Sequence, residues 1–182
     1  LVKYLGNDTE VVIPDGVYKI ESNVFSEFQT LTDIEIPESV EYIGREAFYG
    51  CPSLTRVKLP SKLSTVDWYA FSNCTSLTSV VLPTGLTLIC RGCFRGCTNL
   101  ESINIPHGVT KIDDMAFSGC MNLANIEIPD GVIYVGSYAF DNCTSLSSLT
   151  IGNSVSVIEE YAFDSCNGLV SVTIPDNVTK IG

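Results

Sequence analysis

The chain has 182 residues, and 45% of them are hydrophobic, which is enough apolar material for a buried core. Its 21 acidic residues outnumber its 10 basic residues and give a formal net charge of −11, which repels phosphate backbones and argues against nucleic acid as a partner. No apolar run is long enough for direct membrane insertion, and this chain shows no signal peptide.

A leucine returns every 23 residues along most of the chain. These leucines are Leu31, Leu54, Leu77, Leu100, Leu123, Leu146 and Leu169. With each leucine as position 1 of a repeat, we predict a lead-in over residues 1–7, seven repeats over 8–168 and a truncated eighth repeat over 169–182, all in a single domain spanning 1–182. Because one unit of this size cannot enclose a core, successive repeats must stack.

Each repeat opens with a segment that predicts a β-strand. Positions 4 and 6 are apolar and mostly β-branched, whereas positions 3 and 5 are mostly polar, as in the run from Asp33 to Ile36. A proline follows at position 7 in every repeat except the one containing Gly152, and proline cannot donate to a ladder of hydrogen bonds. The pattern therefore predicts a parallel sheet on one face, with strands that stop at the same height.

The second half of each repeat predicts a short return strand and a helical turn. Apolar residues at positions 10 and 13, such as Val40 and Ile43, line the return path. The A-F-x-x-C segment then places residues four apart on one face of a helical turn. Its phenylalanine predicts one continuous column of rings, formed by Phe25, Phe48, Phe71, Phe94, Phe117, Phe140 and Phe163. The predicted fold class is an α/β repeat solenoid, with short strands and helical turns on the return side.

Six of the eight cysteines occupy position 21. They are Cys51, Cys74, Cys97, Cys120, Cys143 and Cys166. A residue used identically in every repeat is best interpreted as a small apolar filler, so we predict free buried thiols, although the expected spacing also permits disulfides.

One repeat carries two further cysteines, and this is the sharpest candidate for a metal site. Cys90, Cys93 and Cys97 form C-x-x-C-x-x-x-C, and His107, the single histidine, lies one repeat further on. Two of these positions otherwise hold small or acidic residues, so we interpret the cysteines as substitutions of small residues. We predict no metal and no cofactor. One histidine leaves no obvious nucleophile and base pair, so we also predict that the protein is not an enzyme.

The unit L-x-x-I-x-I-P-x-x-V-x-x-I-G-x-x-A-F-x-x-C resembles the leucine-rich repeats of the BspA-like, or treponemal, class over residues 8–182. The resemblance implies a right-handed leucine-rich-repeat superhelix with no catalytic residues. It also implies a protein-binding module of a bacterial cell-surface or secreted protein, with adhesion to host extracellular or matrix proteins. Two alternatives stay open, an intracellular scaffold and a structural spacer within a larger protein.

Ligand recognition must come from the variable positions, because the recurring ones form the core. On the outward face of the sheet, the candidate protein-binding residues are Asp33, Glu35, Arg56, Lys58, Asn104 and Glu127. On the return side the candidate is Trp68, in a row with Tyr42, Tyr69, Tyr134, Tyr138 and Tyr161. The sheet residues equally fit a solvated face, and the aromatic row equally fits rings that pave the gaps between turns.

The truncated repeat over 169–182 leaves an apolar edge without a neighbour. Solenoids need capped ends. From this edge we expect either end-to-end self-association or continuation into a longer array.

Overall fold

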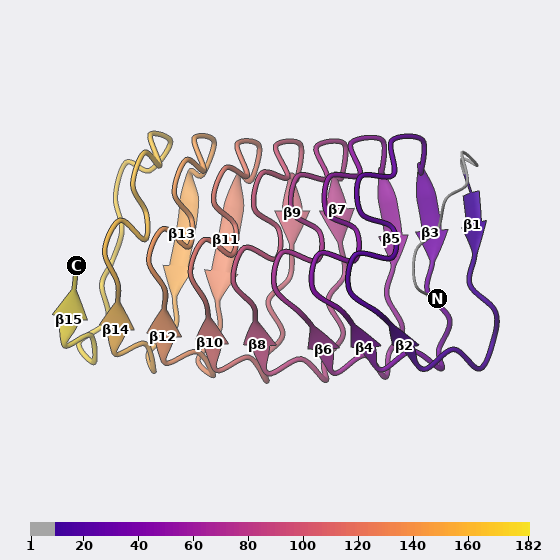
Figure 1. The fold of residues 1–182 in the computed structure, drawn as a ribbon. Helices are drawn as coiled ribbons and strands as arrows, with labels where there is room; N and C mark the ends of the chain where they lie inside the picture. The colour runs from indigo at the N-terminus through magenta and orange to yellow at the C-terminus, as the bar shows by residue number, and fades with distance from the viewer. Residues whose placement is uncertain (1–9) are drawn as a thin grey trace.

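The computed structural model describes residues 10–182, so the predicted lead-in over 1–7 and the first two residues of the first repeat lie outside the described residues. The described chain winds as a solenoid whose laps lie side by side, from β1 near the N-terminal end to β15 at the C-terminal end (Figure 1). We call each lap a coil. Coils 2 to 7 cover residues 31–53, 54–76, 77–99, 100–122, 123–145 and 146–168.

The first strands of successive coils form the parallel sheet that the sequence predicts. They are β1 (Glu10–Val12), β3 (Asp33–Glu35), β5 (Arg56–Lys58), β7 (Ser79–Val80), β9 (Ser102–Ile103), β11 (Asn125–Ile128) and β13 (Ser148–Ile151). Each residue pairs with the residue 23 positions later, as Ile34 does with Val57. The ladder runs β1-β3-β5-β7-β9 and resumes as β11-β13.

The return strands form a second row of parallel pairs along the other side of the coils (Figure 1). They are β2 (Lys19–Ile20), β4 (Tyr42–Ile43), β6 (Thr65–Val66), β8 (Leu88–Ile89), β10 (Lys111–Ile112), β12 (Tyr134–Val135), β14 (Val157–Ile158) and β15 (Lys180–Ile181). They make a three-stranded sheet, β2-β4-β6, and a five-stranded sheet from β8 to β15.

The predicted helical turn at A-F-x-x-C is wrong, and so is the α/β description, because residues 10–182 contain no helix. In coil 2 the amides of this segment alternate between two kinds of partner. Ala47 N donates to Gly44 O three residues back, whereas Phe48 N donates to Ala70 O in the next coil. Positions 16 and 20 of each coil have left-handed backbone, for example Glu46 at φ 56°, which interrupts any helix. Accordingly, the described residues include no helix that could cross a membrane.

The predicted phenylalanine column is confirmed. Consecutive rings from Phe25 to Phe163 stack with centroids 5.1–5.7 Å apart and planes within 14° of parallel. The five rings from Phe48 to Phe140 are fully buried. The position 1 leucines from Leu31 to Leu146 are buried beside them, so one core runs along the solenoid axis.

All eight cysteines are free and buried, as predicted. Their role goes beyond filling space, because each position 21 thiol donates a hydrogen bond to the backbone carbonyl of the phenylalanine one coil earlier. Cys97 Sγ, for example, lies 3.1 Å from Phe71 O. The same bond recurs at 3.1–3.3 Å for the other five thiols of this column. The thiols therefore link successive coils by hydrogen bonds inside the core.

Candidate functional site

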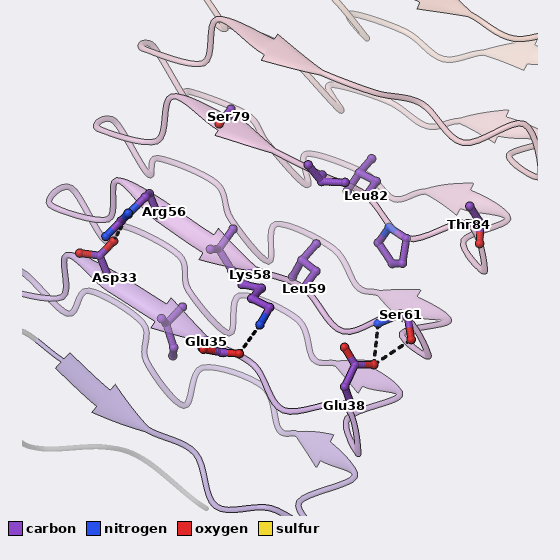
Figure 2. Close-up of a pocket in the computed structure, with 14 residues that line it drawn as sticks. Asp33, Glu35, Glu38, Arg56, Lys58, Leu59, Ser61, Ser79, Leu82 and Thr84 are labelled. Atoms are coloured by element: carbon purple, nitrogen blue, oxygen red, sulfur yellow. Dashed lines mark hydrogen bonds and ion pairs between the residues drawn. The ribbon is translucent and has the colours of Figure 1, made fainter.

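The outward face of the sheet is hollowed over coils 2, 3 and 4. The hollow has a volume of about 810 Å³ and is lined by residues of β3, β5 and β7 and by the loops that follow these strands. Figure 2 shows the pairs Asp33–Arg56 and Glu35–Lys58 along the strands, Leu59 and Leu82 beyond them, and Glu38 with Ser61 on the loops that follow. We call this hollow the sheet groove.

Two ion pairs cross between neighbouring strands in the sheet groove. Arg56 Nε donates to Asp33 Oδ1 at 2.6 Å, and Lys58 Nζ donates to Glu35 Oε1 (Figure 2). The parallel register causes this pairing, because it sets each residue opposite the one 23 positions later. The hydrogen bond from Arg56 lowers the pKa of Asp33 below its ordinary value. Since both pairs are exposed, they contribute little to stability and leave their charges available to a partner.

A third contact fixes the loops beside the strands. The backbone N and the hydroxyl of Ser61 both donate to Glu38 Oε2, at 3.0 and 2.8 Å. These bonds lower the pKa of Glu38 and keep its charge at the rim of the groove. These bonds therefore join the loop after β3 to the loop after β5.

The remainder of the groove is mostly apolar, with Ser79 and Thr84 as its other polar lining residues. Val81 projects outward with 77% of its surface exposed, whereas the neighbouring Leu82 is buried and Leu59 is half-buried. An exposed valine beside fixed ion pairs combines apolar contact area with charges of both signs. This combination resembles the mixture of apolar and charged contacts found in protein interfaces.

The predicted sheet residues divide between the groove and the rest of the sheet. Asp33, Glu35, Arg56 and Lys58 line the groove, whereas Asn104 and Glu127 lie outside its lining. Sequence reasoning missed Glu38, Ser61, Thr84 and Val81. The signal for the first three was their common position, directly after the proline that ends each strand. The signal for Val81 was an apolar residue at an outward strand position.

Asn104 has a structural role that its position did not reveal. Its side-chain Oδ1 accepts from Leu82 N at 2.9 Å, and its Nδ2 donates to Leu82 O at 3.3 Å. The side chain thus bonds to backbone of coil 4 just beyond the β7–β9 pairing, whose last paired residues are Val80 and Ile103. Its amide is occupied by these bonds.

Trp68 is not among the residues that line the groove; it lies on the turn segment that follows the return strand of coil 3, with 47% of its surface exposed. Its aromatic companions make contacts within the solenoid. Lys19 lies over the ring of Tyr42 and Lys111 over that of Tyr134, each 4.8 Å from the centroid. These two tyrosines therefore pack against lysines of the neighbouring coils on the return side.

Tyr42 also makes a short hydrogen bond. Its hydroxyl donates to Asp67 Oδ2 at 2.5 Å, and this bond, together with burial, raises the pKa of Tyr42 to about 12. Burial likewise raises the pKa of the Cys90 thiol to about 12 and that of Cys93 well above its ordinary value. No cluster of three potential metal ligands is found in the part of the chain that the structure describes.

The fold and the repeat can be compared with known proteins. The family model for the BspA type leucine rich repeat region (6 copies) matches residues 3–122 and 89–182. The chain belongs to this family. Membership of this repeat family suggests a protein-interaction module.

Solved structures agree with this assignment. The chain is 33% identical to the T. pallidum leucine-rich repeat protein TpLRR, with a TM-score of 0.84, over 92% of this chain and 80% of that one. It is 24% identical to a leucine-rich repeat protein from Bacteroides ovatus, with a TM-score of 0.71, over 93% of this chain and 52% of that one. The pneumococcal vaccine antigen PcpA is 21% identical, with a TM-score of 0.57, over 89% and 53%. The last two likenesses concern the fold alone. No curated protein sequence is similar enough to count as a relative.

Proposed function

We propose that the chain is a non-catalytic protein-binding module of a bacterial cell-surface or secreted protein, and that it binds its partner through the sheet groove. The observation that carries the proposal is the exposed Val81 beside two ion pairs whose geometry is fixed by strand register. Apolar contact area next to charged groups is a common composition of protein interfaces. Because coils 2 to 4 hold these groups on strands, little conformational entropy is lost in ordering them when a partner binds.

The chemistry of the groove defines the partner. Its acidic row, Asp33 and Glu35, lies beside a basic row, Arg56 and Lys58, one strand away. A complementary segment would carry, in this order across the strands, an apolar side chain against Val81, an acidic group against the basic row and a basic group against the acidic row. The likeness to BspA-type repeats and to TpLRR supports a protein partner, and we propose an adhesive role toward host extracellular or matrix proteins.

A matched pair of variants tests the groove. Val81→Glu places a charge on the apolar part of the groove, whereas Thr150→Glu makes an equivalent change at the same repeat position in coil 7, outside the groove. Binding of the whole chain to a panel of purified extracellular-matrix proteins is measured by surface plasmon resonance. We expect Val81→Glu to weaken binding about tenfold or more and Thr150→Glu to leave it unchanged.

Two outcomes would contradict the proposal. Equal binding by both variants would place the interface elsewhere, and no specific binding to any panel member would favour a spacer or an intracellular scaffold. The location of the protein is tested separately, by brief proteolysis of intact bacteria followed by detection of the chain. A surface protein is cleaved under these conditions, whereas an intracellular scaffold survives.

A further inference from the structure

The turn segments of the solenoid form a second continuous surface, which we call the turn face. It consists of positions 15, 16 and 19 of coils 2 to 7, of which Ser72 and Gly92 are buried and the rest at least partly exposed. Backbone bonds between coils hold each position in a straight column, as when Tyr69 N donates to Arg91 O and Tyr138 N donates to Glu160 O. The position 15 column reads Arg45, Trp68, Arg91, Asp114, Ser137 and Glu160, and the position 19 column reads Tyr49, Ser72, Arg95, Ser118, Asp141 and Asp164.

Charge on the turn face changes sign between coils 4 and 5. Its basic half holds Arg45, Arg91 and Arg95 with one acid, Glu46, and its acidic half holds Asp114, Asp141, Glu160 and Asp164. Among the described residues, Arg91 and Arg95 form no ion pair, although acids outnumber bases 21 to 10 in the chain. Two exposed arginines on one turn therefore present charge that the molecule itself leaves uncompensated.

Aromatic side chains lie in both halves of this surface. In the basic half, Trp68 is 47% exposed, and the ring of Tyr69 covers Gly92 so closely that a side chain there would overlap it. In the acidic half, Tyr138 stacks on Tyr161 with centroids 4.9 Å apart, and Tyr161 is 55% exposed. The turn face thus combines aromatic and arginine residues, the types most enriched in interface hot spots.

We infer that two copies of this chain associate through their turn faces, in antiparallel orientation. The two-fold axis lies in the interface between coils 4 and 5, so coil 4 faces coil 5, coil 3 faces coil 6 and coil 2 faces coil 7 of the second copy. Arg91 of one copy then faces Asp114 of the second copy, and Arg45 of one copy faces Glu160 of the second copy. Each contact occurs twice, as an isologous interface requires.

The rest of the face fits the same register. Tyr69 in coil 3 faces Tyr138 in coil 6, which brings the two aromatic groups together. A parallel arrangement would instead set each coil against its own copy and place Arg91 near Arg95 of the second copy, which like-charge repulsion disfavours. Arg45 also pairs with Glu46 in its own chain at 3.0 Å, but a guanidinium has five N–H donors and can bind a second carboxylate.

The expected association is weak and depends on salt. The turn face is one narrow side of the solenoid, so it buries less than a standard interface. Two copies that each carry a net charge of −11 also repel at long range. Screening removes this repulsion beyond about 8 Å at physiological ionic strength, while direct pairs are screened less. We expect the tightest association at intermediate salt, with weaker association in dilute buffer and in concentrated salt.

Sedimentation equilibrium of the whole chain, over roughly 10 µM to 1 mM, covers the affinities of so small an interface. We expect Arg45→Glu and Glu160→Arg each to raise the dimer dissociation constant about tenfold or more, because each opposes like charges at two symmetric contacts. An equimolar mixture should restore association, since in a mixed dimer every reversed charge faces an opposite one. These residues lie in coils 2 and 7, so restoration within one chain is impossible.

The control pair is Lys62→Glu and Glu41→Arg, which make the same charge changes at exposed sites outside the turn face. Neither should alter the dissociation constant, alone or mixed. Far-ultraviolet circular dichroism confirms that each variant is folded. A wild-type chain that stays monomeric throughout the concentration range would overturn the inference. So would a mixture of Arg45→Glu and Glu160→Arg that stays as weakly associated as each variant alone.

Discussion

Substitution of Phe94 by alanine tests whether the stacked rings hold the coils together. The Phe94 side chain is fully buried, and its ring stacks on Phe71 and Phe117, with both centroids 5.7 Å away. Burial of such a ring contributes about 1.5–3 kcal/mol, and each aromatic pair adds roughly 0.5–1.5 kcal/mol. With the cavity that alanine leaves, we expect a loss of about 3–5 kcal/mol in the free energy of unfolding.

The assay is urea unfolding followed by far-ultraviolet circular dichroism, with the free energy taken from the midpoint and slope. Phe163→Ala is the matched control. Phe163 is only half-buried and stacks on a single ring, Phe140, at 5.3 Å, so its loss should be less than half as large. A loss for Phe94→Ala below about 1 kcal/mol, or equal to that for Phe163→Ala, would refute the role given to the column.

Three further predictions concern the thiols and the return side. Cys97→Ala removes the bond to Phe71 O and should lower the free energy of unfolding by about 1–2 kcal/mol in the same urea assay. A thiol reagent should react with all eight cysteines in the unfolded protein and with few in the folded one, and fewer than eight would indicate disulfides. Asp67→Ala should bring the pKa of Tyr42 from about 12 down toward about 10, as followed by tyrosinate absorbance relative to Tyr42→Phe. Because folding raises the pKa of Tyr42, the hydrogen bond to Asp67 stabilises the fold below the unfolded pKa of Tyr42, and this stabilisation is lost as pH rises through the folded pKa. An unchanged Tyr42 titration in Asp67→Ala would show that Asp67 is not the cause of the shift.

The sheet and the core could be predicted from the sequence because period and position determine them. Apolar residues at positions 4 and 6 can face only one side of a strand, and a phenylalanine that returns every 23 residues must stack on its own copies. The turn could not be predicted in the same way. Ala47 and Cys51 are four residues apart in either a helix or a turn, and the left-handed backbone at Glu46 has no signature in its residue type.

The candidate site was only partly accessible from sequence. Strand alternation placed Asp33 and Arg56 outward and in register, but the groove also depends on loop residues such as Glu38, whose hydrogen bonds arise from neighbouring coils. Asn104 shows the opposite problem. It occupies an outward strand position like the others, yet its amide bonds with the backbone of Leu82. Spacing alone cannot distinguish a side chain that meets solvent from one that meets the chain.

The repeated hydrogen-bond pattern between coils also bears on how such a protein changes over generations. Because every junction uses the same backbone partners 23 residues apart, loss or gain of one whole coil joins two surfaces that already match. Recombination between two similar stretches of the gene, such as those encoding residues 70–77 and 139–146, removes or inserts three complete coils. The array can thus be shortened or lengthened while the remaining coils keep their contacts. Insertion or deletion of a single residue would instead shift the hydrogen-bond register between the affected coil and its neighbour.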